Sequence, residues 1–467
     1  MKLANKILAF LLFGLSAHTM VAQDQETLRL SLNEAQQYAV EHNYTLQNAS
    51  LDVQKAEASK WQTISSMLPQ VKAGFDYQNM CGYEMNFGSR GGGMSSMIPD
   101  SIQIGTMWLP IRLPDGFGGD GESASTGIPM NPSGNFSITA SIALTGAQIV
   151  GIGLSNIALE MANISHKQSV QSTKANVKNV YTSILVMEQT VALLNNSLAN
   201  MQQLYQTTLA SVQAGAAEQI SADKFAVQVA TLRNSINTTQ RTLTMLYNSL
   251  LLQLGADVNT KIQLTTTIEQ LLDVNQAAQM VAGNSFNIDD NYNYQLLSQS
   301  EKLAKKQVTM AWMDYTPVVS AYYQYSAKTY FGKDEGFNMT PPNMIGASVS
   351  LPLFQSGSLM AKVKSAKIDY QETLNSKKQA EDGLHVQYNQ LCYDLISAIE
   401  SYQIQKDNLA VTQRVFDNTA EKFKYGRASN LEVTTANTDI ITAQSNYIQA
   451  VMDVINAQVA LETLLGM

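Results

Sequence analysis

Apolar and small side chains recur in steps of three and four residues along two stretches of the chain. In the stretch near the end these positions are Ile440, Ala443, Tyr447, Ala450, Val454, Ala457, Leu461 and Leu464; in the stretch near the middle they are Phe225, Val229, Leu232, Ile236, Thr239, Leu243, Leu246 and Leu250. An average step of about 3.5 residues is the coiled-coil period. The pattern therefore predicts two long helices, each with one apolar seam that other helices cover.

The two stretches are copies of one unit. Gly215 precedes Gly255 by the same number of residues by which Gly426 precedes Gly466. A glycine at the reversal and another at the end predict a helical hairpin in each copy. The repeat extends upstream, where Asn43, Tyr44, Gln47, Ala56 and Pro69 match Asn291, Tyr292, Gln295, Ala304 and Pro317 at one constant offset. We therefore predict two structural repeats, 23–255 and 291–467, separated by an equatorial segment of short packing elements at 256–290.

The prolines divide the chain further. All ten lie in two windows, 69–132 and 317–352. Proline costs about 3 kcal/mol inside a helix, so the tracts without it are free to form long helices. We expect such helices at 31–67, 151–213 and 358–424. Ser31 and Glu34 have the capping-box spacing that begins the first of them.

After each of the matched prolines the period changes to two. Apolar and polar residues alternate over four segments: 70–78, 136–145, 319–326 and 345–353. They predict β-strands of the length that crosses a bilayer in a barrel. A sheet over a soluble core would alternate in the same way, but no other segment offers it an apolar partner. We assign Ile138 and Val349 to a lipid face, and Thr139 and Ser348 to a lumen face.

Four membrane strands cannot close a barrel, and an open sheet edge is not stable in lipid. More than one chain must therefore contribute strands. The predicted fold class is mainly α with a membrane β part: duplicated long antiparallel helical hairpins plus four transmembrane strands per chain.

The segments between the paired strands, 79–134 and 327–343, are expected to be loops, with the long first one outside the cell. The first contains Met80, Met85, Met94, Met97 and Met107. Thioether sulfur suits Cu(I), but methionine more often packs irregular loops, so we assign no metal site. Cys81 and Cys392 lie in different elements and indicate no disulfide framework. The histidines at 42, 166 and 385 are isolated polar positions.

Residues 1–22 have the pattern of a secretory signal peptide. Lys2 and Lys6 precede a short apolar run from Ile7 to Leu15, and Ala22 marks the expected cleavage point. That run is too short to span a bilayer. We therefore expect an exported protein.

Composition favours long neutral surfaces. Charged residues make up 15% of the chain, against about 25% in typical domains, and Gln, Asn, Ser and Thr make up the difference. Such polarity suits the wall of a wide pore, whereas an ordinary soluble coiled-coil protein usually carries more Glu and Lys. The formal net charge of −8 makes nucleic acid an unexpected partner.

The order and duplication of these elements are similar to those of the TolC-type outer-membrane channel proteins. The resemblance covers essentially the whole mature chain, and three segments of the second half carry it best: LPLFQSG at 351–357, YGRASNLEV at 425–433 and ALETLLG at 460–466. No one of these motifs is specific alone. The first half departs in two ways: residues 143–146 lack the proline found at 352, and the external loop is much longer.

The resemblance implies a homotrimer in which each chain adds four strands to a twelve-stranded barrel in the outer membrane. The helical hairpins would form a hollow α-barrel, a periplasmic tunnel that narrows to a gate at the hairpin tips. It also implies a periplasmic adaptor protein and an inner-membrane pump as partners, besides outer-membrane lipid. Gly215 and Gly426 would lie at the tips that dock the adaptor.

Residues beside the two tips are candidates for the gate. Phe423, Arg427 and Glu432 flank the second tip, and Glu218 and Asp223 lie beside the first. One tip is mostly basic and the other acidic, so we expect ion pairs between neighbouring tips. The resemblance implies that Glu432 lines the constriction. The alternative is that these are solvated charges, worth about 0–1 kcal/mol per pair.

No enzyme signature is present: the sequence has no nucleophile motif, no metal-ligand spacing and no phosphate-binding glycine loop. We expect no catalytic residues, no cofactor and no metal. One candidate function is the passive exit duct of a tripartite efflux or type I secretion system, in the outer membrane and extending into the periplasm. The other is a structural or adhesin-like exported coiled-coil protein. The resemblance also implies that substrate choice resides mainly in the pump.

Overall fold

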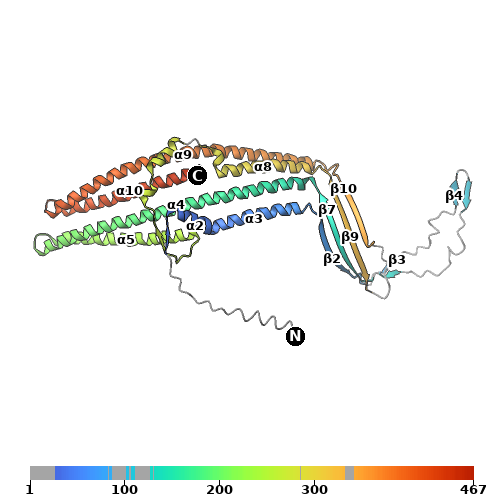
Figure 1. Cartoon of the computed structure of the whole chain (residues 1–467), viewed down its shortest axis with the longest axis horizontal. Helices are drawn as coiled ribbons and strands as arrows, with labels where there is room; N and C mark the ends of the chain where they lie inside the picture. Colours follow the sequence, from blue (N-terminus) through green and yellow to red (C-terminus); the bar gives the residue numbers. More distant parts are fainter. Residues whose placement is uncertain are drawn as a thin grey trace, which may run out of the picture. The chain divides into compact units, whose positions relative to one another are not determined.

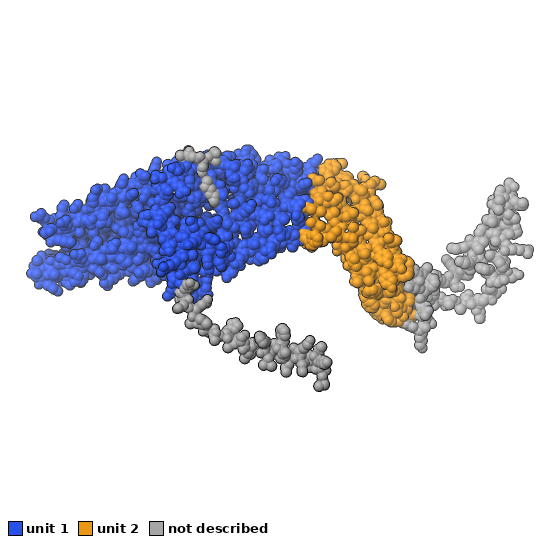
Figure 2. Space-filling view, in the orientation of Figure 1, with its two compact units in different colours: residues 1–60, 153–308, 363–467 blue, residues 61–152, 309–362 orange. Residues whose placement is uncertain are grey.

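The structure is a computed structural model, and it describes residues 27–81, 84–86, 101–104, 107–110, 127–129, 131–283, 286–331 and 341–466. The expected signal peptide at 1–22 and most of the expected loop at 79–134 lie outside these residues. The chain divides into two compact units, coloured in Figure 2: residues 1–60, 153–308 and 363–467, and residues 61–152 and 309–362. We call the first the helical unit and the second the sheet unit.

Long helices dominate the helical unit, as the proline-free tracts predict (Figure 1). The chain forms α2 (Leu32–His42), α3 (Tyr44–Ser65), α4 (Gly146–Gln213), α5 (Gln219–Leu254), α8 (Tyr292–Met313), α9 (Ser358–Lys424) and α10 (Asn430–Leu464). The helices expected at 151–213 and 358–424 are α4 and α9. The two predicted hairpins are α4–α5 and α9–α10.

The single helix expected over 31–67 is wrong in one respect, because the chain breaks at Asn43, between α2 and α3. Asn43 has extended backbone (φ −65°, ψ 126°), and its Oδ1 accepts the Thr45 N–H at 2.8 Å. Its Nδ2 donates to the Gln253 carbonyl oxygen at 2.6 Å, at the end of α5. The predicted start is confirmed: Ser31 and Glu34 form a complete capping box.

The second repeat has the same joint at Asn291, before α8. Its Oδ1 accepts the Asn293 N–H, and its Nδ2 donates to the Leu464 carbonyl oxygen at the end of α10, both at 3.0 Å. The joints therefore connect the end of α5 to the start of α3, and the end of α10 to the start of α8. The buried asparagine satisfies helix-end groups on both sides.

Glycines make the close approach at these joints possible. Gly255 and Gly466 end α5 and α10 in the left-handed region, with φ of 72° and 79°. A Cβ at Gly255 would collide with the carbonyl oxygen of His42, and one at Gly466 with that of Asp290. The repeat predicted from glycine spacing is thus visible as a repeated backbone contact.

The inter-repeat segment contains short elements, as expected: β8 (Ile262–Leu264), α6 (Ile268–Leu271), α7 (Val274–Gly283) and the 3-10 helix η2 (Ile288–Asp290). β8 pairs in parallel with β1 (Leu28–Leu30), a contact that the pattern of the sequence did not predict. The hydroxyl of buried Tyr181 on α4 donates to the Leu30 carbonyl and accepts the Thr266 N–H. The segment is thereby fixed to the helices.

Two apolar clusters hold the helical unit together. The larger includes Val177, Tyr181 and Ile184 of α4 with parts of α5, α9, α10 and the inter-repeat segment. The smaller, which we call the distal cluster, comprises Met201, Leu204, Phe225, Val229, Leu232, Phe416, Val433, Ala436 and Ile440. All four hairpin helices contribute to it, so both hairpins share one core near their tips.

The sheet unit contains one four-stranded antiparallel sheet in the order β10-β9-β7-β2. Its strands are β2 (Gln70–Gln78), β7 (Ser133–Leu144), β9 (Val318–Tyr330) and β10 (Asn343–Ser350). All four predicted strands are present. β7 and β9 are longer than the alternation indicated, and β10 ends two residues before Pro352.

Part of the first expected loop is not irregular. Short strands β3 (Glu84–Asn86) and β6 (Gly127–Pro129) pair, as do β4 (Ser101–Ile104) and β5 (Met107–Pro110). These pairs are too short to produce a readable alternation, which is why the segment was predicted as loop. Within the described ranges, no helix combines the length and the apolar character needed to cross a membrane.

Candidate functional site

The strand register decides which side chains share a face of the four-stranded sheet. Ile138 lies opposite Ala73 and Tyr325, and Thr139 lies opposite Lys72 and Gln324. One face therefore carries most of the apolar positions of the four strands: Val71, Ala73, Phe75, Tyr77, Phe136, Ile138, Ala140, Ile142, Leu144, Val319, Ala321, Tyr323, Tyr325, Ile345, Ala347 and Val349. We call it the apolar face, and the opposite side the polar face.

The apolar face is exposed to an extent that is unusual for a folded sheet. Phe75 is 66% exposed, Ile345 83% and Val349 70%. On the polar face Ser326 is only 7% exposed, whereas its neighbour Tyr325 on the apolar face is 39% exposed. Ser326 is shielded locally, because its N–H donates to the Pro342 carbonyl oxygen at 2.8 Å and its hydroxyl to the Pro341 carbonyl oxygen at 3.4 Å.

The polar face carries the few charges of the four strands, which are Lys72, Asp76 and Lys328. Tyr322 also belongs to this face and breaks the predicted alternation. The register places it opposite Gly346, where a Cβ would collide with the Tyr322 ring. The glycine thus leaves room for the ring to lie against the backbone of β10.

The sheet has two free edges. Among the described residues, β10 pairs only with β9 and β2 pairs only with β7. The outer backbone groups of both edge strands need partners if the sheet lies in an environment without water. The apolar face and the open edges together predict assembly with further strands.

Both hairpin tips reverse the chain in the same way, as the glycine spacing predicted. Gly215 and Gly426 have φ of 75° and 69°. At the second tip, Gly426 N–H donates to the Phe423 carbonyl and Arg427 N–H to the Lys422 carbonyl, both at 2.9 Å. The first tip has the equivalent pair of bonds, so each is a Schellman motif. A Cβ at Gly215 or Gly426 would meet nothing within 4 Å.

Glu432 has a local structural role that the gate hypothesis did not include. It is the third residue of α10, and its Oε2 accepts the Ser429 backbone N–H at 2.6 Å and the Ser429 hydroxyl at 2.9 Å. These bonds, helped by Lys422, hold the pKa of the Glu432 carboxyl below its usual value. The carboxylate therefore stays ionised while it caps the helix.

The other candidate gate residues are not paired with one another within one chain. Asp223 accepts a hydrogen bond from Gln219 of its own helix at 2.8 Å. In the part of the chain that the structure describes, no ion pair joins Arg427 to Glu218 or Asp223, although all three are exposed. Within one chain, the two tips are therefore not joined by these charges.

Phe423 is half-buried and packs against the distal cluster. Its ring meets that of Phe225 edge to face, with centroids 5.6 Å apart, at the margin of the distal cluster. A second contact missed by sequence reasoning joins the tips: Asn430 Nδ2 donates to the Ser221 carbonyl oxygen at 2.7 Å. Both contacts hold the two hairpins of one chain together at the same level.

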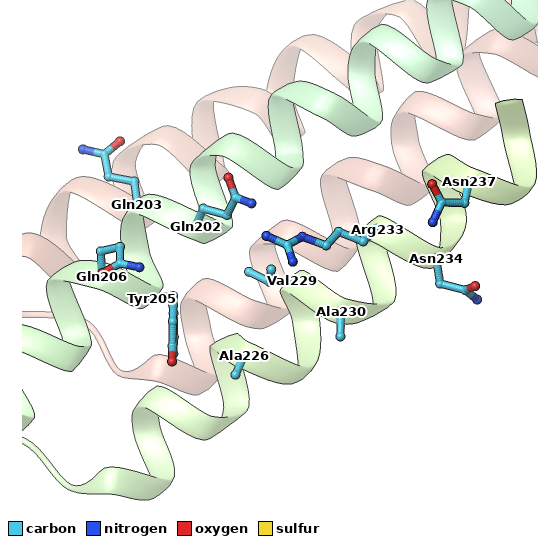
Figure 3. A pocket seen from close by; sticks show the side chains of 10 residues that line it. All are labelled: Gln202, Gln203, Tyr205, Gln206, Ala226, Val229, Ala230, Arg233, Asn234 and Asn237. Atoms are coloured by element: carbon cyan, nitrogen blue, oxygen red, sulfur yellow. The ribbon is translucent and has the colours of Figure 1, made fainter.

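A groove of about 720 Å³ lies between α4 and α5 near the first tip (Figure 3). Amide side chains and Tyr205 line it on the α4 side, and Arg233 reaches into it from α5. Arg233 forms no ion pair with any described residue. The sequence analysis did not identify this groove, because it depends on how two distant helical segments face one another.

Residues able to bind a metal or to form a disulfide were also located. The described residues contain no group of three or more His, Cys, Asp or Glu side chains that could hold a metal ion. Cys81 and Cys392 are free thiols. Of the five methionines considered for Cu(I), Met94 and Met97 lie outside the described residues.

Comparison with known sequences identifies the second repeat. Residues 294–467 match the family described as "Outer membrane efflux protein". Outer membrane efflux protein BepC of Brucella suis is 26% identical over 138 residues, and this alignment covers 30% of this chain and 30% of that protein. The chain thus aligns with less than a third of the length of this relative.

Comparison with solved structures covers nearly the whole chain. The outer membrane protein VceC of Vibrio cholerae has a TM-score of 0.65 at 15% identity, over 93% of this chain and 96% of its own. The CmeC outer membrane channel of Campylobacter jejuni has 0.71 at 13%, over 93% and 85%. The MtrE outer membrane channel of Neisseria gonorrhoeae has 0.68 at 13%, over 93% and 88%. The chain therefore has the fold of the TolC-type outer-membrane channel proteins, and residues 294–467 connect it by sequence to the outer membrane efflux proteins.

Proposed function

We propose that this protein is the outer-membrane channel and periplasmic tunnel of a tripartite efflux or type I secretion system. In this role it is a passive duct for substrates that an inner-membrane pump and a periplasmic adaptor hand over. The observation that carries the proposal is the exposed apolar face of a sheet whose two edges are free among the described strands.

A lipid environment accounts for both the exposed apolar face and the free edges of the sheet. An apolar face loses no hydrogen bonds to water when it enters a bilayer, whereas a free strand edge must find another strand there. Because all neighbouring strands are antiparallel, β10 and β2 run in opposite directions. β10 of one copy can therefore pair antiparallel with β2 of the next, and three copies supply the twelve strands of a closed barrel.

Aromatic side chains on the apolar face support the same environment. Phe75, Tyr77 and Phe136 lie toward the end of the sheet that continues into the loops. Aromatic rings are enriched where a membrane protein meets the lipid headgroups. We assign this end of the sheet to the outer surface of the membrane.

The hairpin tips are the surface proposed to dock the adaptor. Gly215 and Gly426 occupy exposed reversals with open space around them, so a bulky side chain there is not expected to disturb the core. Gly426→Trp should leave the protein assembled in the membrane and abolish export of a drug or toxin. If export is unchanged, the tips are simple turns and docking lies elsewhere.

A structural or adhesin-like exported protein is the competing function, and fractionation separates the two. A channel is expected in detergent extracts of outer membranes, as trimers that dissociate only on heating. Recovery in the soluble periplasm would rule out the channel.

Arginine substitutions on the two sheet faces test the proposal more sharply. Ile138→Arg and Val349→Arg place charge on the apolar face, at a cost of about 2–4 kcal/mol near the middle of a bilayer. Thr139→Arg and Ser348→Arg are the matched controls on the polar face. We expect the first pair to lose trimers from the outer membrane and the second pair to retain them. Equal behaviour of the two pairs would contradict the assigned facing.

A further inference from the structure

A pocket of about 370 Å³ lies beside the first joint, where the start of α3 and the end of α5 face the middle of α4. All of its lining residues are Asn, Gln, Ser or Thr, and they include Thr45, Gln168, Ser172, Thr173, Asn176 and Gln253. No charged side chain and no apolar one lines it among the described residues. We call it the joint pocket.

Buried polar groups in the joint pocket have no hydrogen-bond partner. The Oε1 atom of Gln253 is buried and accepts no hydrogen bond in the described structure. Thr173 is only 8% exposed, and its hydroxyl forms no hydrogen bond with any described residue. Because buried polar groups in folded proteins are normally paired, unpaired ones in a pocket indicate a place for a hydrogen-bonding ligand.

The hydrogen bonds of the joint itself do not use these groups. Asn43 Oδ1 accepts the Thr45 N–H, and Asn43 Nδ2 donates to the backbone carbonyl of Gln253. Gln253 therefore takes part in the joint through its backbone alone. Its side-chain amide remains available to a ligand while the joint stays intact.

The second repeat shows that the fold does not require polar side chains at these positions. The offset that relates Gly215 to Gly426 places Leu384 at the position of Thr173 and Leu464 at the position of Gln253. Both leucines are buried, with 8% and 5% of their surface exposed. The same kind of joint is therefore compatible with apolar packing, and the polar lining is a particular feature of the first repeat.

The lining also decides the class of ligand. A charged ligand would lose hydration without gaining an opposite charge, and an apolar ligand would leave the lining amides unpaired. Each hydroxyl group of a polyol both donates and accepts a hydrogen bond, as the lining amides and hydroxyls do. The volume is near the lower end of the range of small-molecule pockets, about 300–1,000 Å³. A small molecule is therefore expected instead of a polymer.

We propose that the joint pocket binds a small uncharged polyol or sugar, held by the side-chain amide of Gln253 and the hydroxyl of Thr173. This site lies in the helical unit, apart from the sheet and from the hairpin tips. The inference does not depend on the proposed channel function. The lining contains no aromatic ring on which a sugar could stack, so hydrogen bonds alone provide the affinity.

Saturation-transfer NMR tests the proposal on the full protein, purified in lauryldimethylamine oxide because sugar-based detergents would compete. The probes are trehalose, glucose and myo-inositol, and we expect transfer to at least one of them. Thr173→Leu with Gln253→Leu gives the first joint the residues of the second, and should abolish the transfer. Thr207→Leu, at an exposed α4 position outside the pocket, is the matched control and should leave it unchanged.

A milder variant keeps the test decisive if the two leucines disturb folding. Thr173→Val retains the shape of the side chain and removes only its hydroxyl, so it should weaken the transfer while the helical circular dichroism stays that of the wild type.

The outcomes separate this inference from the proposed function. No transfer to any of the three probes would overturn the joint pocket as a ligand site, since water alone would then fill it. Equal transfer in the wild type and in a folded double variant would also overturn it. Equal transfer to gluconate, the anionic counterpart of glucose, would contradict the uncharged class of ligand. Heat-sensitive trimers, measured on the same samples, report on the channel independently of any sugar.

Discussion

The second helices of the two hairpins, α5 and α10, have the same inward positions but fill them differently. In chain order the corresponding residues are Ala222 and Val433, Phe225 and Ala436, Val229 and Ile440, and Leu232 and Ala443. At two of these four positions α10 has alanine where α5 has a large side chain. The first hairpin therefore supplies more of the apolar volume of the distal cluster that the two hairpins share.

A buried amide adds to this difference. Asn437 of α10 is 1% exposed, and neither of its amide atoms has a hydrogen-bond partner in the described structure. The corresponding residue of α5 is Ala226, beside the groove in Figure 3. An unpaired buried amide lowers stability. The second hairpin is thus expected to be the less stable of the two near its tip.

The joints at Asn43 and Asn291, unlike the core residues of α5 and α10, are the same in the two repeats. Asn43 and Asn291 make the same bonds to the ends of α5 and α10, and Gly255 and Gly466 approach the same backbone positions. Duplication has therefore preserved the contacts between backbone and side chain that fix chain direction. The inward residues of α5 and α10 in and near the distal cluster, which only need to fill space, have changed.

The largest expected effect is the loss of stability when an inward residue of α5 or α10 is truncated. Phe225 is fully buried, so Phe225→Ala should lower the free energy of unfolding by about 3–5 kcal/mol. Ala436→Gly, at the corresponding position of α10, should cost only about 1 kcal/mol, through helix propensity. Thermal unfolding in detergent, followed by the loss of helical circular dichroism, measures both. Equal losses of unfolding free energy would mean that α5 and α10 contribute equally to the stability of the distal cluster.

The next effect compares the two kinds of glycine. At Gly215 or Gly426 there is free space for the methyl group of alanine. The substitution is therefore destabilising only through the left-handed backbone, by about 1–2 kcal/mol. Alanine at Gly255 or Gly466 has the same unfavourable backbone conformation, and its Cβ also collides with a backbone carbonyl. We therefore expect the yield of folded protein to fall much further for the second pair. Similar yields would show that the joints can relax.

Three asparagines provide a smaller contrast. Asn43→Ala and Asn291→Ala each remove a helix cap and a buried hydrogen bond, with an expected loss of about 1–3 kcal/mol. Asn437→Leu removes an unpaired amide and should be neutral or stabilising. Urea unfolding in detergent compares the three variants. Destabilisation by Asn437→Leu would indicate that the amide is satisfied, for example by a buried water.

The parts of the fold that could be predicted from the sequence are those that depend on local signals, whereas the joints depend on distant contacts. Proline placement, glycine spacing and the two periodicities are local signals, and they gave the long helices, both tips and all four strands. The break at Asn43 depends on a carbonyl oxygen at Gln253, far away in the chain, so no local pattern revealed it. The β1–β8 pair was missed for the same reason.

The site was predicted less completely than the fold. The role of Glu432 in capping was readable, because Ser429 and Glu432 have the same spacing as Ser31 and Glu34. The packing of Phe423 on Phe225 was not, since it depends on how the two hairpins meet.

The smallest expected effect concerns the charges at the two tips, where the first is acidic and the second basic. Because Arg427 and Asp223 are not paired within one copy, a pair between copies would be solvent-exposed and worth about 0–1 kcal/mol. A threefold ring repeats any such contact three times. We therefore expect Arg427→Ala with Asp223→Ala to raise single-channel conductance in planar bilayers. A double variant with unchanged conductance would show that these charges do not hold the tunnel shut.

Glu432 provides the sharper version of this test, because its carboxylate both caps α10 and is expected to line the constriction. Glu432→Ala should mainly weaken the preference for cations, measured as the reversal potential across a salt gradient. Ser429→Ala is the control, since it weakens the same cap and retains the charge. If both variants change selectivity equally, the effect comes from fraying of the helix start. If only Glu432→Ala does, the second tip contributes its charge to the permeation path.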